Sequence, residues 1–158
     1  MNGFYGECLR LEMFGQSHAE SVGMTLEGVP AGARVDFDAL LRFMQRRAPG
    51  RSEYATARRE ADVPEFTSGL RDGVTDGMPI TAVIRNTDVR PQDYDALRTV
   101  PRPGHADYSA WLRYGSIPTG GGEFSGRMTA PLCIAGGICL QLLENEGVSI
   151  RARVNEIG

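Results

Sequence analysis

The sequence predicts an α+β fold in which antiparallel strands pack against central helices. Two segments that alternate between apolar and polar residues, with only six residues between them, predict a pair of neighbouring strands. Apolar residues at helical spacing predict an amphipathic helix, and a long apolar run predicts a buried one. With 158 residues, 41% of them hydrophobic, the chain is long enough for one domain with a sizeable core.

The first three elements follow from residue spacing. Residues 8–14 and 21–27 alternate, so we expect two strands joined by the loop of residues 15–20. Asp36 is placed to cap a following helix, which should end near residues 48–50. The apolar face of that helix would consist of Phe37, Leu40, Leu41 and Met44.

The middle of the chain is less regular. Residues 51–77 are polar and interrupted by glycines, with no predicted strand or helix. Residues 79–85 read as a strand that begins with proline, where the missing N–H does least harm. Residues 86–104 have no convincing period, and a loop of that length in a compact domain is usually functional or disordered. A short helix over residues 107–114 should turn Trp111 and Leu112 inward.

A long apolar helix is expected over residues 129–146, with Thr129 as its N-cap and Gly147 as its stop. Gly136 and Gly137 lie in its middle, where each glycine costs a helix about 1 kcal/mol relative to alanine. We therefore expect another backbone to pack closely there and the helix to be buried on most sides. Residues 148–154 alternate again and predict a final strand.

Composition excludes several kinds of function. The formal net charge is -3, which argues against non-specific nucleic-acid binding and against a polybasic membrane anchor. All 17 basic residues are arginines, so a lysine Schiff base and a P-loop lysine are excluded. The first residues lack the pattern of a secretory signal, and the longest apolar stretch is too short for a bilayer span. We expect a cytoplasmic protein without a membrane partner.

Cysteine and histidine usage indicates the chemistry that remains. The three cysteines, which are Cys8, Cys133 and Cys139, lack metal-ligand spacing, so we expect buried thiols in a reducing cytosol and no metal site. His18 and His105 are the only histidines, and each suits a site residue as well as an ordinary loop side chain. Arg102 and Asp107 flank the second histidine, a pattern that suits acid–base chemistry beside an anion.

Other motifs leave alternatives open. The arginines at 46, 47, 51, 58 and 59 are either a solvated surface or a set that binds a substrate with several anionic groups. The glycine-rich residues 120–127 could cradle a phosphate at a helix start, although such loops are common. Residues 15–19 resemble a nucleophile elbow without its last glycine, which argues against a serine hydrolase.

Taken in order, these motifs resemble the amino-terminal part of the chorismate synthase family, the lyase of the shikimate pathway. The resemblance covers nearly the whole chain. It is carried by F-G-Q-S-H at 14–18, R-R-A-P-G at 46–50, R-R-E-A-D at 58–62, S-G at 68–69, P-I at 79–80, N-T-D at 86–88, D-Y at 93–94, R-P-G-H-A-D-Y at 102–108, Y-G at 114–115, G-G-G at 120–122 with Ser125, Arg127 and Thr129, and A-G at 135–136.

The resemblance implies a trans-1,4 elimination of phosphate from 5-enolpyruvylshikimate 3-phosphate to give chorismate. It implies reduced FMN as cofactor without net redox change, and NADPH is a possible reductant for it. His18 would protonate the departing phosphate and His105 would protonate the reduced flavin. By motif position the substrate-binding residues would be Ser17, Arg47, Arg102 and Arg127, and the FMN-binding residues would be Glu123, Phe124 and Ser125.

The sequence departs from the family pattern at three sites, one of which is Glu53, where the family often has a second arginine just past R-R-A-P-G and where Arg51 is near enough to substitute. Ala19 replaces the glycine that usually follows the first histidine, and Glu123 and Phe124 stand where the family usually has arginine and serine. Family chains also continue past this length, so we expect residues 1–158 to be the amino-terminal portion of one domain of the family's sandwich fold. The family implies a homo-oligomer, a tetramer. The alternative function is a non-catalytic anion- or nucleotide-binding remnant or an inactive fragment.

Overall fold

The computed structural model describes residues 4–48, 60–87 and 100–156. A five-stranded antiparallel sheet forms one layer, in the order β1-β2-β3-β7-β4. Its strands are β1 (Phe4–Tyr5), β2 (Arg10–Gly15), β3 (Ser21–Glu27), β7 (Ile80–Arg85) and β4 (Glu65–Ser68). The short strands β5 (Leu70–Arg71) and β6 (Val74–Thr75) pair separately with each other.

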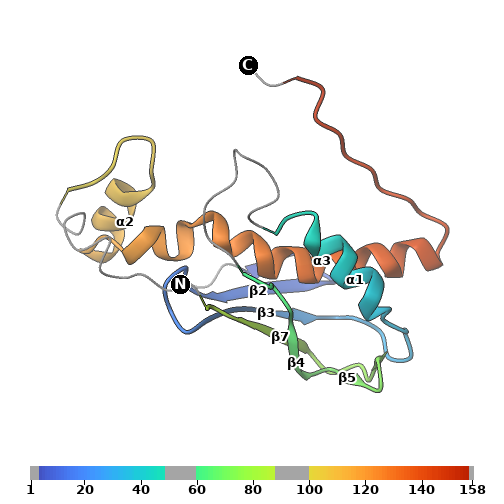
Figure 1. Ribbon diagram of the computed structural model, residues 1–158. Coiled ribbons are helices and arrows are strands. Elements are labelled where there is room, and N and C mark those ends of the chain that lie inside the picture. The colour runs from blue at the N-terminus through green and yellow to red at the C-terminus, as the bar shows by residue number, and fades with distance from the viewer. Residues whose placement is uncertain (1–3, 49–59, 88–99, 157–158) are drawn as a thin grey trace.

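The described residues also contain three α-helices and two 3-10 helices (Figure 1). These are α1 (Phe37–Gln45), α2 (Asp107–Tyr114), η2 (Thr119–Phe124), η3 (Gly126–Met128) and α3 (Thr129–Asn145). Helix α3 crosses the sheet with α1 beside it, and α2 lies beyond the amino-terminal end of α3 (Figure 1). The predicted α+β class, with antiparallel strands packed on helices, is confirmed.

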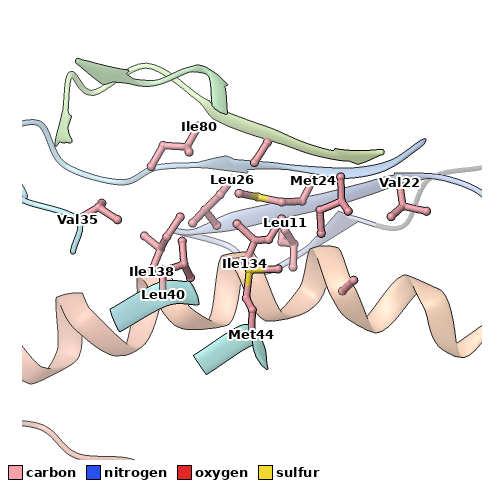
Figure 2. Packing of buried hydrophobic residues seen from close by; sticks show 14 of the residues in the cluster. Leu11, Val22, Met24, Leu26, Val35, Leu40, Met44, Ile80, Ile134 and Ile138 are labelled. Atoms are coloured by element: carbon pink, nitrogen blue, oxygen red, sulfur yellow. The ribbon is translucent and has the colours of Figure 1, made fainter. Parts of the chain in front are cut away.

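Side-chain alternation decides which face of the sheet meets the helices. In β3, Val22, Met24 and Leu26 are buried, and their partners across the ladders to β2 and β7 are also mostly apolar. Figure 2 shows these side chains pointing toward Ile134 and Ile138 of α3, and Leu40 and Met44 of α1 belong to the same cluster. The apolar faces of the strands and of the helices therefore pack into one hydrophobic core, as residue spacing predicts.

Close contact between α1 and α3 depends on one glycine. A Cβ atom added to Gly137 would lie 2.4 Å from Cδ1 of Leu40 and 3.1 Å from Cδ1 of Phe43. At Gly136 a Cβ atom would meet nothing within 4 Å. Helix α1 thus packs closely at Gly137, but through the side chains of Leu40 and Phe43 and not through its backbone as expected. Most residues of α3 are buried or partly buried, as expected, while Leu132 is 46% exposed.

Helix ends follow the predicted signals with one exception. Asp36 caps α1, and its Oδ1 accepts a hydrogen bond of 2.9 Å from the N–H of Ala39. Gly147, with φ of 76°, follows the end of α3 and its N–H donates to the carbonyl of Glu144. Thr129 is the first residue of α3 and not its N-cap, because η3 already supplies the preceding turn. Its hydroxyl donates instead to the carbonyl of Gly126 at 2.6 Å.

Other local predictions are wrong. Residues 148–154 are exposed and form no strand, because no described strand lies beside them to pair with their backbone. Trp111 and Leu112 are 49% and 64% exposed, and α2 buries Asp107 and Ala110 instead. Strands β4, β5 and β6 were not expected, since each is too short to show alternation.

The thiols are less buried than predicted. Cys8 is exposed, and Cys133 and Cys139 are partly buried. Desolvation raises the pKa of both thiols on α3. The helical run Thr119–Asn145 is long and apolar enough to cross a membrane by length and composition alone, a test that core helices also pass.

The two adjacent glycines of α3 give a paired test of this packing. Gly136→Ala should raise the free energy of unfolding by about 0.5–1 kcal/mol, because alanine favours the helix and meets open space. Gly137→Ala should lower it by about 1 kcal/mol, because the added methyl group overpacks Leu40. Urea unfolding measures both. Equal effects at the two positions would contradict the close approach of α1.

Candidate active site

The turn that carries His18 is fixed by contacts with two distant segments. It joins β2 to β3, and Asn86, just after β7, donates from Nδ2 to the carbonyls of Gln16 at 3.1 Å and Ala19 at 2.7 Å. The N–H of Ser17, a residue that is only 3% exposed, donates to the carbonyl of Gly122 at 3.3 Å. The turn is therefore attached to both the sheet and the triple-glycine segment.

The imidazole of His18 lies directly against the backbone of Gly120. A Cβ atom at residue 120 would stand 2.1 Å from Cδ2 and 2.4 Å from Nε2 of that ring. Gly120, Gly121 and Gly122 all have positive φ, so the segment curls in a way that other residues adopt with strain. The predicted glycine loop and the predicted histidine turn are brought together.

Two arginines from different segments share one buried carboxylate. Arg47, just past α1, donates from Nη1 to Oδ2 of Asp62 at 2.5 Å, and Arg127 of η3 donates from Nη1 to Oδ1 of the same residue. Asp62 is 4% exposed and Arg127 is 5% exposed. Two guanidinium groups against one carboxylate leave a net positive charge at this point.

Among the described residues, the Nε atoms of both arginines have hydrogen-bond acceptors, whereas Nη2 of Arg127 does not. Nε of Arg127 donates to Oδ1 of Asn86 at 3.0 Å, and Nε of Arg47 donates to Oγ1 of Thr129 at 2.9 Å. Nη2 of Arg127 is buried without a hydrogen-bond partner in the described part of the chain. A buried polar group without a partner costs free energy, so this nitrogen is suited to an anionic ligand.

Glu60 attaches the segment that carries Asp62 to the end of β7. Its carboxylate accepts hydrogen bonds from Thr87, at 3.0 Å from the N–H and 2.7 Å from the hydroxyl. Thr87 follows Asn86 directly, so residues 60–62 and 86–87 form one connected support. Through Asn86 this support joins the arginine pair to the His18 turn.

The second histidine lies in a separate structure at the start of α2. Arg102 donates to both oxygens of Asp107, at 2.6 Å from Nε and 2.9 Å from Nη2, and its own N–H also donates to Oδ2. His105 is exposed on this closed loop, and its N–H donates to the carbonyl of Arg102. No hydrogen bond or ion pair between described residues joins His105 to His18.

The segment predicted to contact FMN is folded against α2. The rings of Tyr114 and Phe124 lie 6.4 Å apart, and Phe124 is 43% exposed. A hydrogen bond to the carboxylate of Glu123 raises the pKa of Tyr114. The hydroxyl of Ser125 accepts a hydrogen bond from the N–H of Arg127 at 3.2 Å and thereby begins η3.

Sequence reasoning gave roles to the histidines and arginines but not to the residues that hold them. Asp62, Asn86 and Gly120 were noted only as members of motifs. Asp62 and Asn86 are an acidic and an amide residue in segments without a periodic pattern, so the sequence gives no sign that Asp62 is buried and Asn86 partly buried, and Gly120 is visible only as part of the triple glycine. The predicted arginines at 51, 58 and 59 lie outside the described residues. Among the described residues no group of three or more potential ligands could hold a metal ion.

Comparison with known proteins gives a consistent result. The family model described as chorismate synthase matches residues 9–158. A chorismate synthase of Lancefieldella parvula is 49% identical over 99% of this chain and 42% of its own length. One of Aeropyrum pernix is 48% identical over 97% of this chain and 40% of its own length.

A crystal structure of chorismate synthase is also similar, with a TM-score of 0.62 and 26% identity over 90% of this chain and 36% of that chain. The chain thus spans about two fifths of the length of the curated relatives it matches.

The Arg102–Asp107 pair makes a testable contribution to stability. The hydrogen bonds from Arg102 hold the pKa of Asp107 below its usual 3.8. The pair therefore stabilises the fold fully above pH 3.8, and that stabilisation is lost as the pH falls through the lowered pKa. Asp107→Asn should lower the free energy of unfolding by about 2 kcal/mol at pH 7. Urea unfolding between pH 7 and pH 3 should show the difference shrinking below about pH 4. Asp72→Asn, an exposed control, should show no such change.

Proposed function

Because this chain belongs to the chorismate synthase family, we propose that it contributes the phosphate-releasing side of a site that converts 5-enolpyruvylshikimate 3-phosphate to chorismate. The reaction is a trans-1,4 elimination that removes phosphate and a proton. The observation that carries the proposal is the buried, unpartnered Nη2 of Arg127 beside a second arginine. A substrate with several anionic groups supplies the acceptors that such nitrogens require.

Arg127 and Arg47 would bind anionic groups of the substrate. A guanidinium group forms parallel hydrogen bonds to carboxylate or phosphate oxygens, and in a buried site each bond gains strength from the low local dielectric. Ser17, 3% exposed in the adjoining turn, is a further substrate contact by motif position. These groups would hold the substrate so that its leaving phosphate is near His18.

His18 would act as the general acid for the departing phosphate. An imidazole titrates near neutral pH, so it can be protonated before the reaction and give up the proton during it. Packing against Gly120 and the hydrogen bonds from Asn86 to its turn restrict where the ring can lie. A leaving group that is protonated as its bond breaks departs without developing a further charge.

His105 and Arg102 would act at a different part of the site. Because Arg102 is paired with Asp107 through two nitrogens, a substrate anion would have to share that guanidinium with the carboxylate. The same pair closes the loop that presents His105. We propose His105 as the group that exchanges a proton with the reduced flavin.

The residues expected to contact FMN fit one part of that cofactor. The exposed ring of Phe124 suits an isoalloxazine face, whereas the Glu123 carboxylate, already bonded to Tyr114, does not suit a phosphate. We propose that Phe124 holds the ring system and that the cofactor's phosphate is bound elsewhere. When bound, reduced flavin supplies electron density transiently to the elimination, which ends without net redox change.

The family also implies an assembly and a compartment. We propose that the protein works as a cytoplasmic homo-oligomer, a tetramer as in the family, on a small phosphorylated substrate. Size-exclusion chromatography with light scattering would measure the assembly.

A chimera tests the catalytic function. Residues 1–158 would replace the matching part of the Lancefieldella parvula enzyme, which is 49% identical over 160 residues. The chimera should form chorismate anaerobically with reduced FMN. His18→Ala and His105→Ala should each lower kcat by about 10²- to 10⁴-fold, the usual contribution of a general acid. An inactive but folded chimera would favour the non-catalytic alternative, and near-full kcat in both variants would make the histidines structural.

The arginines should show a different kinetic signature. In the same chimera, Arg47→Gln and Arg127→Gln should raise KM more than they lower kcat, because binding of the ground state and the transition state is lost together. Circular dichroism would confirm that the variants fold. Equal losses in kcat with an unchanged KM would contradict a binding role.

A further inference from the structure

Asp62 combines an uncommon backbone conformation with burial between two cationic side chains. Its φ is 51°, in the left-handed region, and its side chain is 2% exposed. Asp72 has nearly the same φ in an exposed turn, so the backbone conformation alone does not distinguish Asp62. What distinguishes Asp62 is its burial with the guanidinium groups of Arg47 and Arg127 on its two oxygens.

We propose that Asp62 is a positioning residue that fixes the directions in which Arg47 and Arg127 present their free N–H groups. The inference rests on the proposed function, in which those groups bind an anion of the substrate. Each guanidinium is bonded at Nη1 to Asp62 and at Nε to a second residue, Thr129 for Arg47 and Asn86 for Arg127. A planar guanidinium group that is hydrogen-bonded at two nitrogens cannot rotate, so the N–H groups of its third nitrogen, Nη2, point in one fixed direction.

The alternative role for Asp62 is charge compensation alone, and the two roles predict opposite results. Removing a negative charge from beside two cations should strengthen anion binding if only Coulomb attraction matters. Removing an orienting acceptor should weaken it, because both guanidinium groups then lose the bond that defines their direction. The sign of the change therefore separates positioning from charge.

Asp62→Asn is a suitable variant because asparagine tolerates the left-handed conformation at least as well as aspartate. Asp72→Asn is a matched control. Asp72 has φ of 52° and the same substitution, but it is exposed in the turn between β5 and β6. Effects of the aspartate-to-asparagine change on a residue with positive φ should appear in both variants, whereas effects on the two arginines should appear only in Asp62→Asn.

The first measurement needs no ligand. The ¹⁵N side-chain spectrum of arginine reports rotation of each guanidinium, and Arg47→Lys and Arg127→Lys assign the two signals. Both should rotate slowly in the native chain, quickly in Asp62→Asn, and slowly in Asp72→Asn. Slow rotation of both groups in folded Asp62→Asn would overturn the proposal.

The second measurement uses inorganic phosphate, titrated at constant ionic strength and followed by calorimetry. Asp62→Asn should bind phosphate at least about tenfold more weakly than the native chain, despite its more positive site. Asp62→Glu, which keeps the charge but displaces it, should also bind weakly. Unchanged or tighter binding in Asp62→Asn, or full rescue by Asp62→Glu, would overturn the proposal.

The two measurements separate failure of this inference from failure of the proposed function. Arg127→Gln should abolish phosphate binding if the proposed anion site is correct. If the native chain binds no phosphate while Asp62→Asn still releases both guanidinium groups, the anion site fails and positioning by Asp62 stands. If Arg127→Gln abolishes binding and Asp62→Asn does not weaken it, the anion site stands and positioning fails.

Discussion

The close packing of α1 on α3 at Gly137 is the contact on which the rest of the structure depends. Both helices lie on the same face of the sheet, and the missing side chain at Gly137 admits Leu40 and Phe43 to the surface of α3. This sets the distance between the end of α1 and the start of α3. Arg47 can then reach Thr129 at 2.9 Å, and Asp62 can bind Arg47 and Arg127 together. Hydrophobic packing thus sets the geometry of charged groups that it does not touch.

The elements that sequence reasoning predicted well are those whose signals are local. Alternation located β2 and β3, and helical spacing with an aspartate cap located α1. The failures share one cause, which is that the outcome depends on distant neighbours. Residues 148–154 alternate as a strand does but have no described partner, and β4 pairs with β7 although its four residues carry no pattern. Trp111 is apolar, but α2 has no described surface to cover it.

The candidate site divides in the same way. Residue type and motif order identified His18, Arg47 and Arg127 as chemically interesting, and the contacts link their segments through Asn86, Asp62 and Gly120. No rule of spacing could have paired Arg47 with Asp62 or Arg127 with Asn86, because these contacts cross between segments without periodic structure. Burial of polar residues outside helices and strands is a property of the whole fold. In the sequence, these buried polar residues appear only as isolated acidic and amide residues among glycines, with no sign that they are buried.

The contact between His18 and Gly120 has a consequence for how the sequence can vary. The space that a side chain at residue 120 would occupy is filled by the imidazole, to within 2.1 Å of the missing Cβ position. Any larger residue there must displace the ring before it can be accommodated. Residue 120 contributes no reactive atom, yet a substitution there would move the imidazole of His18. The choice of residue at 120 is therefore constrained by the position that His18 must hold.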